Sequence, residues 1–190
     1  MPDAEASEQY ASADGMLALL GLLAGRVAPG ERGRVDTLTH SLQAATRAER
    51  AGAGTPLVVA ALCHDAGKVF SMRRHDQLSA ALLSGYVPPD VVRVVRHHVD
   101  LTAQAWAAEE AGKRRRYRRA SWYPTAVQFV DEWDVPSFDP DYPTEPLAHF
   151  EPALRELFAR QRWPDPPRLP AQLVALRGAV ERCRRAAGVG

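Results

Sequence analysis

Hydrophobic residues recur along most of the chain at spacings of three and four, which is the periodicity of a helix with one buried face. Between Val35 and Ala51, for example, Leu38, Leu42 and Ala45 fall on one stripe. Glycine and proline residues separate the periodic stretches. The pattern predicts an all-α fold without a convincing strand, with helices at 14–27, 35–51, 57–63, 76–86, 90–101, 122–133, 147–160 and 171–187.

The segment LVVAALC, residues 57–63, is apolar throughout. Its composition alone would also suit a buried strand, but its alanines and its helical neighbours favour a buried helix. Residues 135–146 combine proline, aspartate and aromatic residues and are predicted to form a loop. Ser121 is expected to cap the helix that follows it, which has Pro124 near its start.

A chain of 190 residues with 46% apolar and 25% charged residues is typical of a single globular domain. Residues 1–12 are small and polar, and we expect them to be a mobile N-terminus. Residues 13–190 are expected to form one helical domain that includes the C-terminal helices. The longest apolar run, Met16 to Ala24, is too short to span a bilayer, so no membrane association is expected.

Charge and cysteine content indicate where such a protein works. Lys+Arg 24 and Asp+Glu 23 leave a net charge of +1, which excludes a generally basic nucleic-acid-binding protein. The two cysteines, Cys63 and Cys183, do not make the framework of a secreted disulfide-rich domain, and they favour a reducing cytoplasmic location. No nucleic-acid partner is therefore expected, while the oligomeric state stays open.

The strongest charge feature is the basic run from Lys113 to Arg119. It suits a solvated loop, or a mobile lid whose arginines, Arg114 to Arg119, meet an anionic substrate. A nucleic-acid contact is a third interpretation, which the low net charge and the lack of stacking aromatic residues disfavour.

The histidines are concentrated in one part of the chain, since five of the six lie between His40 and His98. Imidazole and carboxylate together suit iron, manganese, cobalt, nickel or zinc. His64 and Asp65 are adjacent, and adjacent side chains on a helix diverge by about 100°. Both can therefore reach one site only where a helix ends, which is where the pattern puts them.

Four segments carry a family resemblance: THSLQAA (39–45), LCHDAGK (62–68), HDQLSAALL (75–83) and VVRHHV (94–99). Their order resembles the H…HD…D pattern of HD-domain metalloproteins, over residues 34–150. The resemblance implies a single helical-bundle HD domain, which is usually a metal-dependent phosphohydrolase. Two further histidines resemble the second-metal ligands of dinuclear members. The ordering is most similar to the HD-domain diiron oxygenases, the group of inositol oxygenase and the hydroxyphosphonate-cleaving oxygenases.

This resemblance implies two irons in a mixed-valent Fe(II)/Fe(III) centre, with O2 as co-substrate. Asp65 would bridge the irons. One iron would be held by His40, His64 and Asp134, and the other by His75 and His98.

Two ligands have neighbours that could replace them. Asp134 follows the family's aromatic position in Glu132-Trp133-Asp134, and Asp131 is the alternative. His98 resembles the family ligand better than His97. Lys68 matches the lysine of the HDxGK motif, which implies a substrate-binding and catalytic role, although a solvated cation after a helix end would have the same sequence.

The substrate is less well defined, because Thr102 and Asp131 stand where the phosphonate-cleaving relatives have cations. Asp131 and Trp133, with Glu132, Phe138 and Tyr142, instead suggest an acidic and aromatic neighbourhood suited to a cation such as trimethylammonium. The same aromatic residues could simply pack the last helices. For the partners of the metal-bound histidines, Asp36, Asp76 and Asp100 are equal candidates.

The expected function is thus an O2-dependent diiron oxygenase that cleaves a C–P or C–C bond of a small hydroxylated substrate. The alternative is a dinuclear phosphohydrolase acting on a nucleotide or a small phosphate ester, because the same ligands serve both chemistries. A non-catalytic HD domain is the third interpretation, and the complete ligand set argues against it.

Overall fold

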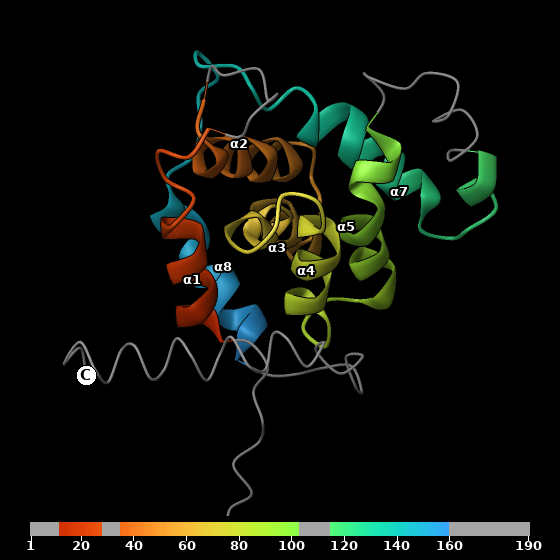
Figure 1. Ribbon diagram of the computed structural model, residues 1–190, viewed down its shortest axis with the longest axis horizontal. Coiled ribbons are helices and arrows are strands. Elements are labelled where there is room, and N and C mark those ends of the chain that lie inside the picture. The colour runs from red at the N-terminus through yellow and green to blue at the C-terminus, as the bar shows by residue number, and fades with distance from the viewer. Residues whose placement is uncertain (1–11, 28–34, 103–114, 160–190) are drawn as a thin grey trace, which may run out of the picture.

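The computed structural model describes residues 12–27, 35–102 and 115–159, and within these ranges the chain is helical with no strand (Figure 1). The all-α prediction is confirmed. The predicted N-terminal segment up to residue 11 and the predicted helix at 171–187 lie outside the described residues. The elements in chain order are α1 (Ala13–Gly21), α2 (Thr37–Arg50), α3 (Thr55–Cys63), η1 (Ala66–Val69), α4 (His75–Leu83), α5 (Pro89–Leu101), α7 (Tyr123–Gln128), η2 (Phe129–Asp134) and α8 (Leu147–Phe158).

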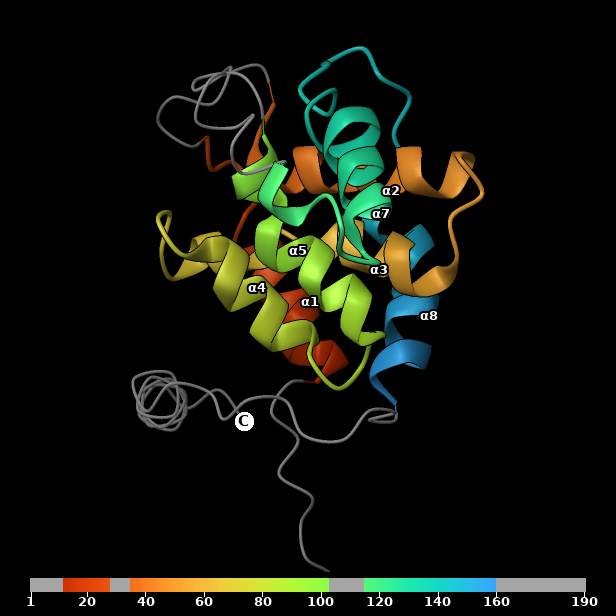
Figure 2. The ribbon, with the colours of Figure 1, turned by 90° about the vertical axis from the view of Figure 1, so that its right-hand side faces the viewer.

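Helix α3 lies in the middle of the molecule, with α2, α4, α5 and α8 packed around it (Figures 1 and 2). Its residues from Val58 to Cys63 are all buried. Gly54 is the N-cap, and Pro56 occupies the first turn, where its missing N–H has no helical partner to lose. LVVAALC is therefore a buried helix, as predicted, because its apolar side chains are surrounded on every side.

Helix α2 begins at a cap that also holds the turn following α1. The Asp36 carboxylate accepts hydrogen bonds from Thr39 N, at 2.7 Å, and from Gly25 N, at 2.8 Å. Gly25 has a φ of +70°, a conformation that only glycine adopts at little cost. Helix α1 itself ends earlier, at Gly21, and beyond it Leu23 N and Ala24 N donate to carbonyls three residues back, so the predicted extension of this helix to Val27 is wrong.

The predicted helix at 122–133 is two different helices. After the 6 residues of α7 the chain widens into a π-helix, η2, in which Val135 N donates to Val130 O five residues back. Ser121 does not cap α7; its hydroxyl donates to Asp90 Oδ2 at 2.8 Å, and Trp122 is the N-cap residue. The π-helix extends the element to Asp134, one residue beyond the predicted end.

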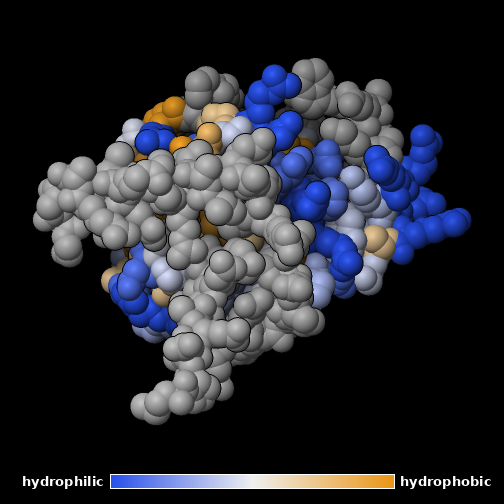
Figure 3. Space-filling model, turned by 60° about the horizontal axis from the view of Figure 1, so that its bottom comes forward, coloured by the Kyte–Doolittle hydropathy of each residue, from blue (hydrophilic) through white to orange (hydrophobic). Residues whose placement is uncertain are grey.

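The visible surface is strongly hydrophilic on the right-hand side of Figure 3, and hydrophobic colour is confined to small areas. Arg115, Arg116, Arg118 and Arg119 are all exposed, whereas Lys113 and Arg114 lie outside the described residues. In the part of the chain that the structure describes, every helix is too short or too polar to cross a membrane.

Candidate metal centre

Four histidines from four elements meet in the interior. His40 lies on α2, His64 caps the end of α3, His75 begins α4, and His98 lies in the last turn of α5. All four are buried, and His75 is the most exposed of them, at 8%. The sequence places these residues far apart, so the packing of the helices around α3 brings them together.

Each of these histidines turns its Nδ1 toward a backbone carbonyl. The partners of His64, His75 and His98 are the carbonyls three residues earlier, at 2.7, 2.8 and 2.7 Å. His40 Nδ1 lies 2.8 Å from the carbonyl of Ser137. Because a carbonyl only accepts hydrogen bonds, Nδ1 carries the proton in every case and Nε2 is left with its lone pair.

The partners of the histidines are therefore carbonyls, and two of the suggested aspartates have other roles. Asp36 caps α2. Asp100 lies 3.1 Å from Nδ1 of His97, the neighbour of the clustered His98.

The four Nε2 atoms form two pairs. His40 Nε2 lies 3.1 Å from His64 Nε2, and His75 Nε2 lies 3.2 Å from His98 Nε2. Two lone pairs facing each other at this distance repel unless a cation lies between them. Ligands bound to one metal at 2.0–2.2 Å are roughly 3 Å apart, so each pair has the spacing of two ligands of one ion.

Asp65 lies between the two pairs. Its Oδ2 is 3.5 Å from Nε2 of both His40 and His64, and its Oδ1 is 3.2 Å from His75 Nε2 and 3.8 Å from His98 Nε2. The residue has φ −103° and ψ 1°, the bridge conformation common in active sites. This bend between α3 and η1 lets His64 and Asp65 reach the same site.

The Asp65 carboxylate is buried with unfilled acceptor capacity. Within the described residues, neither oxygen accepts a well-aligned hydrogen bond. The Lys68 ammonium does lie 2.7 Å from Oδ2, and we regard this contact as an ion pair. One lysine leaves most of the lone pairs of a fully buried carboxylate unpaired, which is costly unless cations complete the site.

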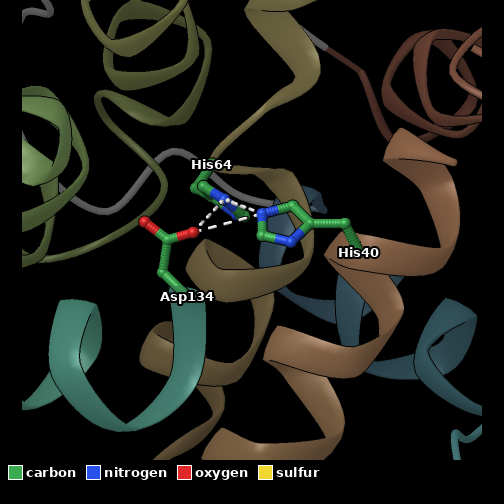
Figure 4. Close-up of side chains that lie close together, drawn as sticks. All are labelled: His40, His64 and Asp134. Atoms are coloured by element: carbon green, nitrogen blue, oxygen red, sulfur yellow. Dashed lines mark hydrogen bonds and ion pairs between the residues drawn. The ribbon is translucent and has the colours of Figure 1, made fainter. Parts of the chain in front are cut away.

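Asp134 completes the group around His40 and His64 (Figure 4). Its Oδ1 lies 3.1 Å from His40 Nε2 and 3.6 Å from His64 Nε2. The three side chains come from η2, α2 and the end of α3. The π-helix carries Asp134 inward while Asp131 stays exposed on the other side of the same turn.

The charges of the cluster suit metal binding. Burial raises the pKa of Asp65 and of Asp134, but the surrounding histidines, with Lys68 beside Asp65, outweigh burial and hold both below their usual range. Burial lowers the pKa of His75 and favours its neutral form. For His40, Asp134 and Asp65 outweigh burial and raise the pKa. Ionised carboxylates and neutral imidazoles are the forms that bind metal. The pKa shifts of Asp65, Asp134 and His75 favour these forms, whereas that of His40 favours a proton that a bound ion would displace.

The buried histidine and aspartate side chains could hold a metal ion, and their spacing is compatible with two. His40, His64 and Asp134 surround one position, His75 and His98 surround the other, and Asp65 offers one oxygen to each. The structure thus brings together all six residues proposed as ligands, with Lys68 in contact with the central carboxylate.

The residues proposed around the substrate are arranged differently. Trp133 is buried and packs edge-on against Phe129, and its Nε1 has no hydrogen-bond partner within the described residues. Tyr142 is unavailable to a substrate cation, because the Arg47 guanidinium lies 3.8 Å from its ring centre. Glu132 is exposed and accepts a hydrogen bond from Gln128. The expected acidic and aromatic pocket is therefore not formed as a whole.

Phe138 does lie beside the cluster. Its ring stacks on the His40 imidazole with 4.3 Å between ring centres and 21° between planes. Sequence reasoning missed the contribution of Ser137 entirely, because a backbone carbonyl has no signature in the sequence.

Comparison with known proteins agrees with this geometry. The family model described as HD domain matches residues 37–137, more than half of the chain and the whole of the histidine cluster. No curated protein matches the chain significantly.

Proposed function

Because the chain belongs to the HD domain family, whose members are generally metal-dependent enzymes, we propose that it is an O2-dependent diiron oxygenase. In this proposal it cleaves a C–P or C–C bond of a small hydroxylated substrate. The observation that carries the proposal is the position of Asp65, with one carboxylate oxygen toward each histidine pair. A single metal would need only one pair.

The ligand sets of the two positions differ, and this difference suits a reaction at one of them. The first position has His40, His64 and Asp134 besides Asp65. The second has only His75 and His98, so more of its coordination sphere is left for substrate and O2. When bound, a pair of irons would supply the redox chemistry that activates O2 for oxidation of the carbinol carbon.

Lys68 is the residue best placed to bind a substrate oxygen. Its side chain is 6% exposed, and its ammonium lies against the bridging carboxylate. A buried ammonium attracts an anionic or hydroxyl oxygen strongly, because little water screens it. Lys68 therefore orients the substrate beside the bridge. This supports a hydroxylated substrate that also carries an anionic group, such as a hydroxyphosphonate.

The phosphohydrolase is the second candidate, and the same lysine favours it, since a buried cation beside two metal positions also suits a phosphate ester. There the metals would activate water and stabilise the leaving oxygen. The two functions require different metals, because oxygenation needs redox-active iron and hydrolysis does not.

The deciding experiment is anaerobic reconstitution with ferrous iron followed by brief exposure to O2. We expect two irons per chain and an EPR signal of a coupled, spin-half Fe(II)/Fe(III) pair. Hydroxyphosphonates, trimethylammonium compounds and polyols are then tested for their ability to change this signal. The Asp65→Ala variant is the control and should give neither iron pair nor signal. A silent centre with phosphatase activity in manganese, cobalt or nickel would reject the oxygenase in favour of the hydrolase.

A further inference from the structure

Helix α2 holds the segment that follows Asp134 as well as carrying His40. Gln43 lies one turn after His40 on the same face and is fully buried. Its side-chain amide makes two hydrogen bonds with the backbone of Asp139. Gln43 Nε2 donates to Asp139 O at 2.6 Å, and Asp139 N donates to Gln43 Oε1 at 3.3 Å. A buried amide with both ends used in this way fixes the position of the segment.

The same segment contacts His40 at two points. The Ser137 carbonyl accepts from His40 Nδ1 at 2.8 Å, and the Phe138 ring stacks on the imidazole. The other three clustered histidines use carbonyls only three residues away. Their orientation is thus set locally, whereas the orientation of His40 depends on a segment 97 residues further along the chain.

We infer that Gln43 is a positioning residue for the first metal position: by holding Asp139 it keeps Ser137 and Phe138 on His40, and so keeps Nε2 of His40 aimed at the ion. This inference rests on the proposed dinuclear centre. It predicts different effects at the two metal positions, because His75 and His98 make no use of this segment for their orientation.

Two further contacts restrain the segment. Arg47, on the next turn of α2, donates from Nη2 to Pro136 O at 3.1 Å, and the Ser137 hydroxyl donates to Trp133 O. Removing the Gln43 contact should therefore make the orientation of the His40 ring less fixed, while the remaining contacts keep the segment beside it. Substitution of a group that orients a metal ligand typically weakens affinity about 10- to 100-fold, and we expect about tenfold here.

The test is Gln43→Glu, which keeps the shape of the side chain but turns a carboxylate oxygen toward the Asp139 carbonyl. Cobalt(II) affinity is measured by titration against a competing chelator in two backgrounds. In His75→Ala only the first metal position is complete, and Gln43→Glu should weaken binding there about tenfold. In His40→Ala only the second position is complete, and Gln43→Glu should change nothing. Gln128→Glu makes the same chemical change on an exposed side chain and should leave both affinities unaltered.

Equal affinity with and without Gln43→Glu in the His75→Ala background overturns the inference, as does an equal loss in both backgrounds, which would indicate a general structural role. Failure of the wild-type chain to bind two metals would instead reject the dinuclear centre itself. Should Gln43→Glu not fold, Gln43→Met decides in the same way, because it removes both hydrogen bonds to Asp139 and keeps an unbranched side chain of similar length.

Discussion

Each of the four clustered histidines keeps its Nδ1 proton on a backbone carbonyl and points Nε2 inward. This arrangement sets the tautomer before any metal binds, so no proton has to be rearranged within the ring. The neighbours His97 and His98 show how sharply position decides the role. His98 joins the cluster, whereas His97 stacks on Trp122 at 5.0 Å and lies 3.1 Å from Asp100.

We therefore predict opposite outcomes for two adjacent substitutions. His98→Ala should reduce bound metal from two ions to one, because it leaves His75 as the only histidine of its pair. His97→Ala should keep both ions and lower the free energy of unfolding by about 1 kcal/mol, since it removes an aromatic stack. Metal analysis of the purified variants measures the number of bound ions, and denaturant unfolding measures the free energy of unfolding. Loss of metal in His97→Ala would mean that the ligand has been assigned to the wrong histidine.

Among the elements, η1 and α4 approach each other more closely than a side chain would permit. A Cβ on Gly67 would lie 2.4 Å from the His75 carbonyl oxygen and 2.8 Å from Leu78 Cβ. Gly67 N also donates to Ser79 Oγ on α4 at 2.9 Å. This close approach fixes the distance between Asp65, just before η1, and His75, at the start of α4.

Gly67→Ala should force these two elements apart. We expect a loss of about 1–3 kcal/mol in the free energy of unfolding, as for other overpacked interiors, together with weaker metal binding at the His75 and His98 position. Gly21→Ala is the matched control, because nothing lies within 4 Å of its Cβ position. Unchanged stability and metal affinity in Gly67→Ala would contradict the close packing described here.

The cap at the start of α2 gives a prediction for pH. Burial raises the pKa of Asp36, but hydrogen bonds from Thr39 and Gly25 outweigh it and hold the pKa below its ordinary value. The stabilisation is therefore present above the unfolded pKa of about 3.9 and is lost as the pH falls further. Asp36→Ala should lower stability by about 1 kcal/mol at neutral pH.

Unfolding measured across pH 3 to 7 checks this directly. The difference between wild type and Asp36→Ala should narrow below about pH 4. A difference that stayed constant over the whole range would show that the carboxylate charge contributes nothing to the cap.

For the whole molecule, the proposed metal centre would join α2, α3, α4, α5 and η2. Bound ions should therefore stabilise the entire helical domain. Metal at 100 times its Kd adds about 2.7 kcal/mol. For a chain of this size each kcal/mol raises Tm by about 2–4 °C.

We accordingly expect saturating metal to raise Tm by about 5–10 °C per site. Asp65→Ala should reduce the increase, because both positions lose their shared ligand and the second keeps only His75 and His98. Differential scanning calorimetry with metal and with chelator makes the comparison. An undiminished increase in Asp65→Ala would show that the metal stabilises the protein from another site.

Helix positions and the buried α3 were predictable because each leaves a pattern in adjacent residues, whereas the members of the cluster were predictable only through the resemblance to HD-domain proteins. The periodicity that defines α2 and the apolar run that defines α3 arise from local contacts with the core. His64 and Asp65 indicate the site in the sequence because they are adjacent, and adjacency can be recognised without knowledge of the tertiary contacts. The end of α1 was missed because the apolar pattern continues through Leu22 and Leu23, although the backbone hydrogen bonds there already span three residues.

The sequence by itself determined that the chain is helical, that it carries an HD-domain histidine set, and that Asp65 follows the central helix. Only the tertiary structure decided that His98 and not His97 joins the cluster, and that a π-helix turns Asp134 inward. It also decided that Arg47 covers Tyr142 and that a distant carbonyl orients His40. The physical reason is the separation along the chain of the residues whose contacts decide each feature. Periodicity records which face of an element is buried, whereas the direction of a ligand depends on contacts between residues that are far apart in the chain.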